Sequence, residues 1–161
     1  MRSVSLPGSR FVTPPPVEMA AHLVRAMVAV SPSPLALGAS RIVGGAGWSV
    51  VTRRLGAPTG GLRGMMAPRA GGGFLFVIDP RPAPMERDIL ELGGVNRDLL
   101  MNLRLAHELG HVFFYEPDPP HRRLPARTRS EEEEQFCDAF AFALTAAAWP
   151  GSAKVLTRLA A

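Results

Sequence analysis

Cysteine is almost missing from this sequence, because Cys137 is the only one in 161 residues. A single cysteine excludes a disulfide framework and a CxxC metal site. Long apolar runs are missing as well: the most apolar early stretch, residues 19–30, is interrupted by His22 and Arg25 and is too short to cross a bilayer. Residues 1–16 lack the apolar core of a signal peptide. We therefore expect a cytoplasmic protein without a membrane partner.

Phosphate-binding glycine motifs are also missing. Gly44, Gly45 and Gly47 are not followed by a glycine at the spacing of a GxGxxG fingerprint. Gly60-Gly61 is not followed by Gly-Lys-Ser/Thr, as a phosphate loop would require. We interpret both stretches as turns or loops.

Acidic residues are scarce in the first half of the chain. Residues 1–78 hold eight arginines and one acid, Glu18, for a net charge of +7. Residues 79–161 hold ten basic and thirteen acidic residues, for a net charge of −3, so that the whole chain carries +4. The arginines of the first half occur singly, apart from Arg53-Arg54, and no aromatic residues alternate with them. This pattern is a weak indication of nucleic-acid binding, and we expect no direct contact with nucleic acid.

The composition predicts one globular domain. Hydrophobic residues make up 47% and charged residues 20% of the chain, which is typical of a folded protein and not of a disordered one. A length of 161 residues fits a single domain. Residues 1–15 are rich in Ser, Pro and Gly, so we expect a flexible N-terminal arm there and one domain over residues 16–161.

Hydrophobic periodicity places the secondary structure. Apolar residues recur at helical spacing in three stretches, and β-prone residues fill two others. We expect helices over residues 17–30, 97–115 and 131–149, strands over 48–52 and 74–78, a short helical tail after 152, a mobile connection over 57–73 and a proline-rich link over 80–96. The two strands could pair antiparallel. The predicted fold class is therefore α+β, with helices packed around a small, mainly antiparallel sheet.

The helix expected over residues 97–115 carries the pattern HExxH at residues 107–111. Positions i and i+4 lie on one face of a helix, so His107 and His111 can bind the same metal ion. Glu108 lies beside the pair, where it can take a proton from an attacking water molecule. The alternative is an accidental pair of helical histidines, but two of only four histidines in the chain occur here around a glutamate. We predict a Zn²⁺ site with His107 and His111 as ligands and Glu108 as catalytic base.

A catalytic zinc site needs a third protein ligand. The extended pattern HExxHxxGxxH is excluded, because Phe114 stands at its glycine position and Pro117 at its third histidine position. The other common solution is a glutamate from a later helix. Four consecutive glutamates, residues 131–134, begin the last long helix.

Glu134 is the expected ligand among these four. Ser130 and Glu133 fit a capping box, and the first two glutamates fit the preference for negative charge in the first helical turn. Asp138 follows Glu134 by one turn on the same face, and we expect it to accept the outer N–H of a ligating histidine. The alternative is that the four glutamates form a solvated helix start.

Two segments resemble those of the ImmA/IrrE family of small metallopeptidases. Residues 102–111, NLRLAHELGH, are similar to the family segment rFxxAHELGH. Residues 134–141, EQFCDAFA, are similar to its later segment ExxANxFA, and residues 74–79 resemble the strand before its metal helix. The resemblance covers residues 70–150.

The resemblance implies a gluzincin-like zinc endopeptidase built from helices around a small antiparallel sheet. By position, it makes His107, His111 and Glu134 the ligands and Glu108 the base. It further implies that the substrate is a regulatory protein, such as a helix-turn-helix repressor. The sequence shows no helix-turn-helix segment, so we expect any DNA targeting to come through the partner. No feature of the sequence indicates the oligomeric state.

Several points stay open at this stage. Tyr115, His121 and the arginines of residues 122–129 are candidates for stabilising the oxyanion or contacting substrate. An extended substrate is expected to add to the edge of the sheet at residues 74–78. Two other functions compete with the peptidase: a non-catalytic protein-interaction module that contains zinc, and a basic nucleic-acid-binding protein. A structural zinc site would have no use for Glu108, which argues against the first of these.

Overall fold

The computed structural model describes residues 15–55, 63–93, 97–115 and 131–160. The expected N-terminal arm lies outside this set, apart from Pro15. The described chain forms an α+β fold of six α-helices around a three-stranded mixed sheet. The elements are α1 (Pro16–Val30), a 3-10 turn η1 (Pro34–Leu37), α2 (Ala39–Gly45), β1 (Ser49–Thr52), β2 (Gly64–Pro68), β3 (Phe74–Ile78), α3 (Pro84–Gly93), α4 (Arg97–Tyr115), α5 (Glu131–Ala148) and α6 (Ala153–Ala160). No described helix is long and apolar enough to cross a membrane.

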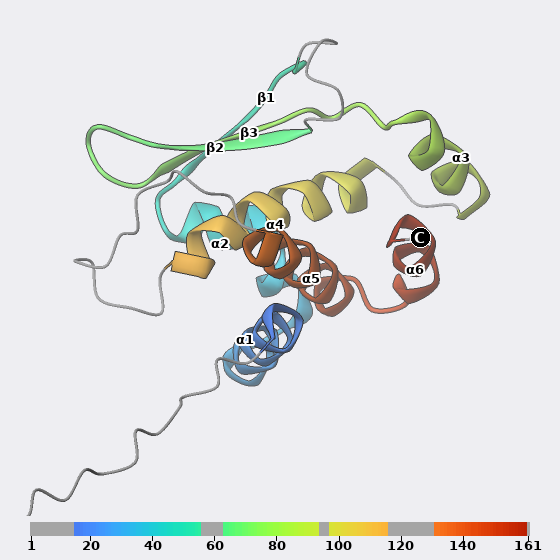
Figure 1. The fold of residues 1–161 in the computed structure, drawn as a ribbon, viewed down its shortest axis with the longest axis horizontal. Helices are drawn as coiled ribbons and strands as arrows, with labels where there is room; N and C mark the ends of the chain where they lie inside the picture. Colours follow the sequence, from blue (N-terminus) through green and yellow to red (C-terminus); the bar gives the residue numbers. More distant parts are fainter. Residues whose placement is uncertain (1–14, 56–62, 94–96, 116–130, 161) are drawn as a thin grey trace, which may run out of the picture.

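The sheet, α4, α5 and α1 follow one another through the molecule (Figure 1). Helix α4 contacts β2 and β3 on one side and α5 on the other, and α5 in turn packs against α1. Phe76 and Ile78 of β3, Leu109 of α4 and Phe140 of α5 are fully buried between these layers. Burying each of these side chains contributes roughly 1.5–3 kcal/mol. The two helices that carry the predicted site residues therefore lie in the middle of the fold.

Helices α4 and α5 approach each other closely at Gly110. A Cβ atom at this position would lie 3.0 Å from the Cα of Cys137 and 3.2 Å from its Sγ. A side chain here would therefore press on the backbone of α5. Cys137 is fully buried in this contact, and burial raises the pKa of its thiol above the ordinary value. The contact holds the first turns of α5 against the HExxH segment.

The sheet corrects one expected strand pairing. Strand β3 lies in the centre, pairing antiparallel with β2 and parallel with β1. The chain reverses once between β1 and β2 and again in the turn from β2 to β3, so β1 and β3 run in the same direction. That second turn is closed by Arg69 and Gly73 and places Gly72 and Gly73 at positive φ. The expected antiparallel pairing of residues 48–52 with 74–78 is therefore wrong.

Three short elements replace expected loops. Strand β2 falls within the expected mobile connection; it lacks β-branched and aromatic residues and takes its conformation from pairing with β3. Helix α2 falls within a stretch interpreted as a turn, and Asn102 supplies a tertiary contact at its start by accepting the Ala39 N–H at 2.7 Å. Helix α3 falls within the expected proline-rich link. Pro84 opens it, and the Glu86 carboxylate accepts the Ala83 N–H at 2.7 Å, as in a capping box.

A buried ionic network joins the end of β3 to α4. The Asp79 carboxylate is fully buried and accepts hydrogen bonds from the Leu55 N–H and from the backbone and guanidinium of Arg81. Arg104 of α4 donates to the carbonyls of Asp79 (2.6 Å) and Arg81 (2.8 Å) and to Glu86 Oε1 (2.6 Å). The network fixes α4, one turn before Glu108, against the end of the sheet.

Replacing Asp79 with Asn is expected to destabilise the protein. The hydrogen bonds from Arg81 hold the pKa of Asp79 well below its ordinary value of 3.8, although burial opposes them. The stabilisation from the ionised carboxylate is thus present above pH 3.8 and is lost as the pH falls through the pKa of the folded state. We expect Asp79→Asn to cost about 2 kcal/mol at pH 7, or roughly 4–8 °C in Tm. Thermal unfolding from pH 7 to pH 3 checks this; a difference that does not shrink at acid pH would contradict it.

Candidate metal centre

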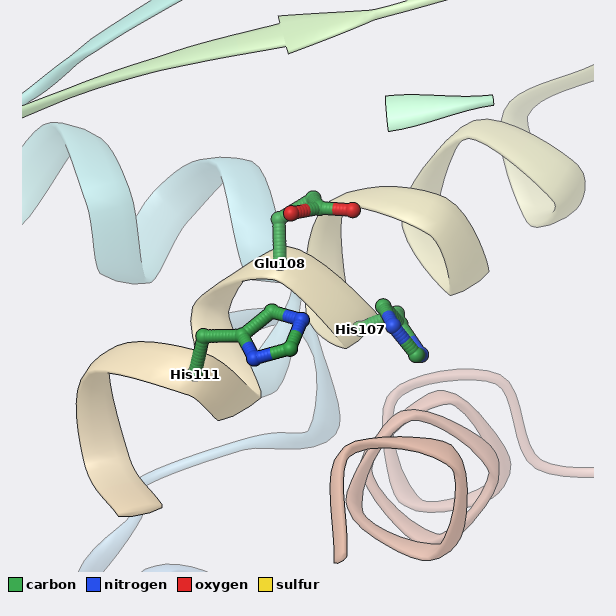
Figure 2. Close-up of side chains that lie close together, drawn as sticks. All are labelled: His107, Glu108 and His111. Carbon is green, nitrogen blue, oxygen red and sulfur yellow. The ribbon is translucent and has the colours of Figure 1, made fainter. Parts of the chain in front are cut away.

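Helix α4 brings three side chains of the HExxH segment together. His107, Glu108 and His111 each offer one donor atom, and these atoms lie within 4.8 Å of one another. The two imidazole rings are 5.2 Å apart at 79°. Figure 2 shows both rings beside α4 and the Glu108 carboxylate on the side of the helix that faces the strands. The arrangement follows from the helical spacing and could hold a metal ion.

Helix α5 places Glu134 opposite both histidines. Glu134 Oε2 lies 3.3 Å from His107 Nε2, and Glu134 Oε1 lies 3.6 Å from His111 Nε2. Donor atoms about 2.0–2.1 Å from a tetrahedral metal ion are separated by roughly 3.4 Å. The two Nε2 atoms and the Glu134 carboxylate therefore have the separations of donors around one ion. Glu134 meets the histidines through two different oxygens, whereas Glu108 belongs to the looser group within 4.8 Å.

The outer nitrogen of His107 contacts Asp138. Asp138 Oδ1 lies 2.8 Å from His107 Nδ1, which is the type of contact expected from the sequence. An ionised carboxylate can only accept, so the Nδ1 carries the proton and the Nε2 presents its lone pair to Glu134. Burial lowers the pKa of His107, but the hydrogen bond to Asp138 and the charges of Glu108, Asp138 and Glu134 outweigh this effect and raise it. The surroundings of His107 therefore favour a bound positive charge.

The outer nitrogen of His111 contacts Glu133, a partner that the sequence analysis missed. Glu133 Oε1 lies 2.7 Å from His111 Nδ1, and both side chains are only 4% exposed. Glu133 had been explained by a capping box with Ser130, which lies outside the described residues. The available signal was its position next to Glu134: α4 crosses α5 at its first turn, so neighbouring glutamates can face different histidines there. Both histidines thus have an acidic partner on Nδ1.

The donor atoms fit a metal ion better than they fit one another. Within the described chain, the buried atoms His111 Nε2 and Glu134 Oε1 have no hydrogen-bond partner. With the Nδ1 proton directed at Glu133, both atoms present lone pairs across 3.6 Å. Burying unsatisfied polar atoms costs about 1–3 kcal/mol each, and a cation between them would remove this cost. Two imidazole nitrogens and a carboxylate suit a divalent transition metal.

Strand β2 covers the Glu108 carboxylate. Glu108 is 5% exposed and lies against Gly64, the first residue of β2. The side chain therefore occupies the space between α4 and the sheet, apart from the contact surface with α5. This position separates it from the two Nδ1 partners and from Glu134.

Other predicted site residues are not placed by the structure. His121 and the arginines of residues 122–129 lie outside the described residues, and the side chain of Tyr115 is not described either. The expected substrate edge at residues 74–78 is wrong, because β3 is paired on both sides. The edges of the described sheet are β1 and β2.

Comparison of the chain with family models, with curated proteins and with solved structures finds no match in any of the three. The site's chemistry therefore has to be inferred from its own geometry.

Proposed function

We propose that the protein is a zinc-dependent endopeptidase whose metal ligands are His107, His111 and Glu134. The observation that carries the proposal is the pairing of roles on each histidine. Each Nδ1 is engaged by a carboxylate, and each Nε2 faces the Glu134 carboxylate at 3.3 or 3.6 Å. A bound zinc ion would polarise a peptide carbonyl and lower the pKa of a water molecule towards about 7.

Glu108 is the proposed general base. Its carboxylate belongs to the same group within 4.8 Å as the two histidines but projects towards the strands, away from Glu134 (Figure 2). In this position it would accept a proton from the attacking water at a carboxylate oxygen and deliver it to the leaving amine nitrogen. Glu133 and Asp138 would keep the two imidazoles oriented by accepting their Nδ1 protons. A purely structural zinc site would leave this second function of the HExxH glutamate without a purpose.

Strand β2 is the proposed docking edge for an extended substrate. Among the described strands it pairs only with β3, and its first residue touches Glu108. A peptide that adds to this edge would run past the metal centre with its backbone held by hydrogen bonds. The resemblance to ImmA/IrrE sequences suggests a regulatory protein, such as a helix-turn-helix repressor, as the physiological substrate.

Zinc-dependent cleavage of a proteome-derived peptide library tests the proposal. The zinc-loaded protein is expected to generate new peptide termini, detected by mass spectrometry. Chelation by 1,10-phenanthroline should abolish them, and added zinc should restore them, because the ligand set has no other means to activate water. If the protein binds zinc but produces no zinc-dependent termini in the library or in intact helix-turn-helix proteins, a non-catalytic zinc module becomes the better explanation.

A further inference from the structure

Gly64 is buried at the start of β2, directly against the proposed base. A Cβ atom at this position would lie 3.0 Å from both Cγ and Oε1 of Glu108 and 3.2 Å from Cδ1 of Ile78. Side-chain Cβ atoms rarely approach a neighbour so closely, so at least one neighbour would have to move. The φ angle of Gly64 is not positive. A need for special backbone geometry therefore does not explain the glycine, whereas the space taken by Glu108 does.

The backbone on either side of Gly64 is held in place. Gly64 is in register with Ile78 of the central strand, and the Asp79 N–H donates to the Arg63 carbonyl at 2.9 Å. The Asp79 side chain and carbonyl are in turn fixed by Arg81 and by Arg104 of α4. The Glu108 side chain ends in a carboxylate that can rotate, so it is the neighbour that would yield.

We infer that Gly64 is a positioning residue, which sets the location of the Glu108 carboxylate by presenting bare backbone to it. This inference rests on the proposed function of Glu108 as base, but the contact itself does not. A side chain at Gly64 would push the carboxylate away from its place by a few tenths of an ångström or more. Displacements of about 1 Å can cost roughly 100-fold in rate. The ligands His107, His111 and Glu134 do not touch Gly64, so metal binding should be spared.

A double-mutant cycle in thermal stability tests the contact without requiring any activity. Gly64→Ala is measured in the wild-type and in the Glu108→Ala background. Because truncating Glu108 removes the atoms that the new Cβ would meet, Gly64→Ala should be better tolerated there, by about 2–6 °C in Tm. Gly71→Ala is the matched control, since its Cβ would have no heavy atom within 4 Å. A Gly64→Ala effect that is the same in both backgrounds overturns the inference.

Kinetics then separate positioning from general damage to the fold. On the peptides cleaved by the zinc-loaded wild type, Gly64→Ala should lower kcat about 10–100-fold while KM and zinc affinity change less than about threefold. In the Glu108→Gln background it should cause no further loss of rate, because the carboxylate it acts through is already inactive. An unchanged kcat, or losses that multiply in the double variant, overturns the inference. A wild type that cleaves nothing refutes the peptidase function and leaves the stability cycle to decide the contact.

Discussion

Replacing Glu108 with Gln should lower kcat by roughly 10²–10⁴-fold, the range expected for loss of a general base. Gln has nearly the same shape, so the packing against Gly64 should be kept, but its amide cannot accept a proton at neutral pH. Zinc affinity should change only a few-fold, because the proposed ligands are His107, His111 and Glu134. Single-turnover cleavage of the library-derived peptides and zinc competition with a chromophoric chelator measure the two quantities.

The division between these two quantities is the informative part. Loss of cleavage together with loss of zinc would make Glu108 a ligand, as its membership in the group within 4.8 Å would allow. Retained cleavage with zinc bound would refute its role as the base. The Gly71→Ala protein serves as the reference for an unperturbed site, because its new Cβ atom would meet no heavy atom within 4 Å.

Replacing Glu133 with Gln is expected to weaken zinc binding by about 10–100-fold, as changes to the outer partner of a ligating histidine typically do. Glu133 Oε1 lies 2.7 Å from His111 Nδ1 in a contact that is 4% exposed on both sides. Gln keeps the size of the side chain but removes the charge that makes His111 a stronger donor. Competition with a chromophoric chelator at fixed pH and ionic strength measures the loss.

Two further substitutions sharpen this test. Glu132→Gln removes the same charge one residue earlier from an exposed side chain, and it should change zinc affinity only a few-fold. Asp138→Asn should have a smaller effect than Glu133→Gln, because Asp138 is 67% exposed and water can replace its contact with His107. Equal losses for Glu132→Gln and Glu133→Gln would show that only the overall charge of the helix start matters.

Long periodic elements could be predicted from the sequence, whereas short ones could not. The bounds of α4 are those expected, and α5 and β3 agree closely, because hydrophobic periodicity or a β-prone run extends over each of them. Strand β2 and helix α2 were missed, since pairing with β3 and the contact from Asn102 support them. The direction of β1 relative to β3 depends on how many reversals separate them, which requires knowing that β2 exists.

The site shows the same limit. The i, i+4 spacing was sufficient to place His107 and His111 together and to align Asp138 with Glu134. Glu133 was missed because a local capping explanation was available, while its contact with His111 depends on how α4 crosses α5. Gly64 gives no local signal at all, because its significance comes from a side chain on another element. Local patterns thus indicate candidate ligands, and tertiary packing determines what orients them.

The zinc content of the purified full chain tests the central claim most directly. After equilibration with micromolar free zinc, native mass spectrometry should show one zinc ion per wild-type chain and none in His111→Ala or Glu134→Ala, with Glu132→Gln as the control that keeps it. A wild-type chain without zinc under these conditions, or a full zinc complement in both ligand variants, would contradict the account.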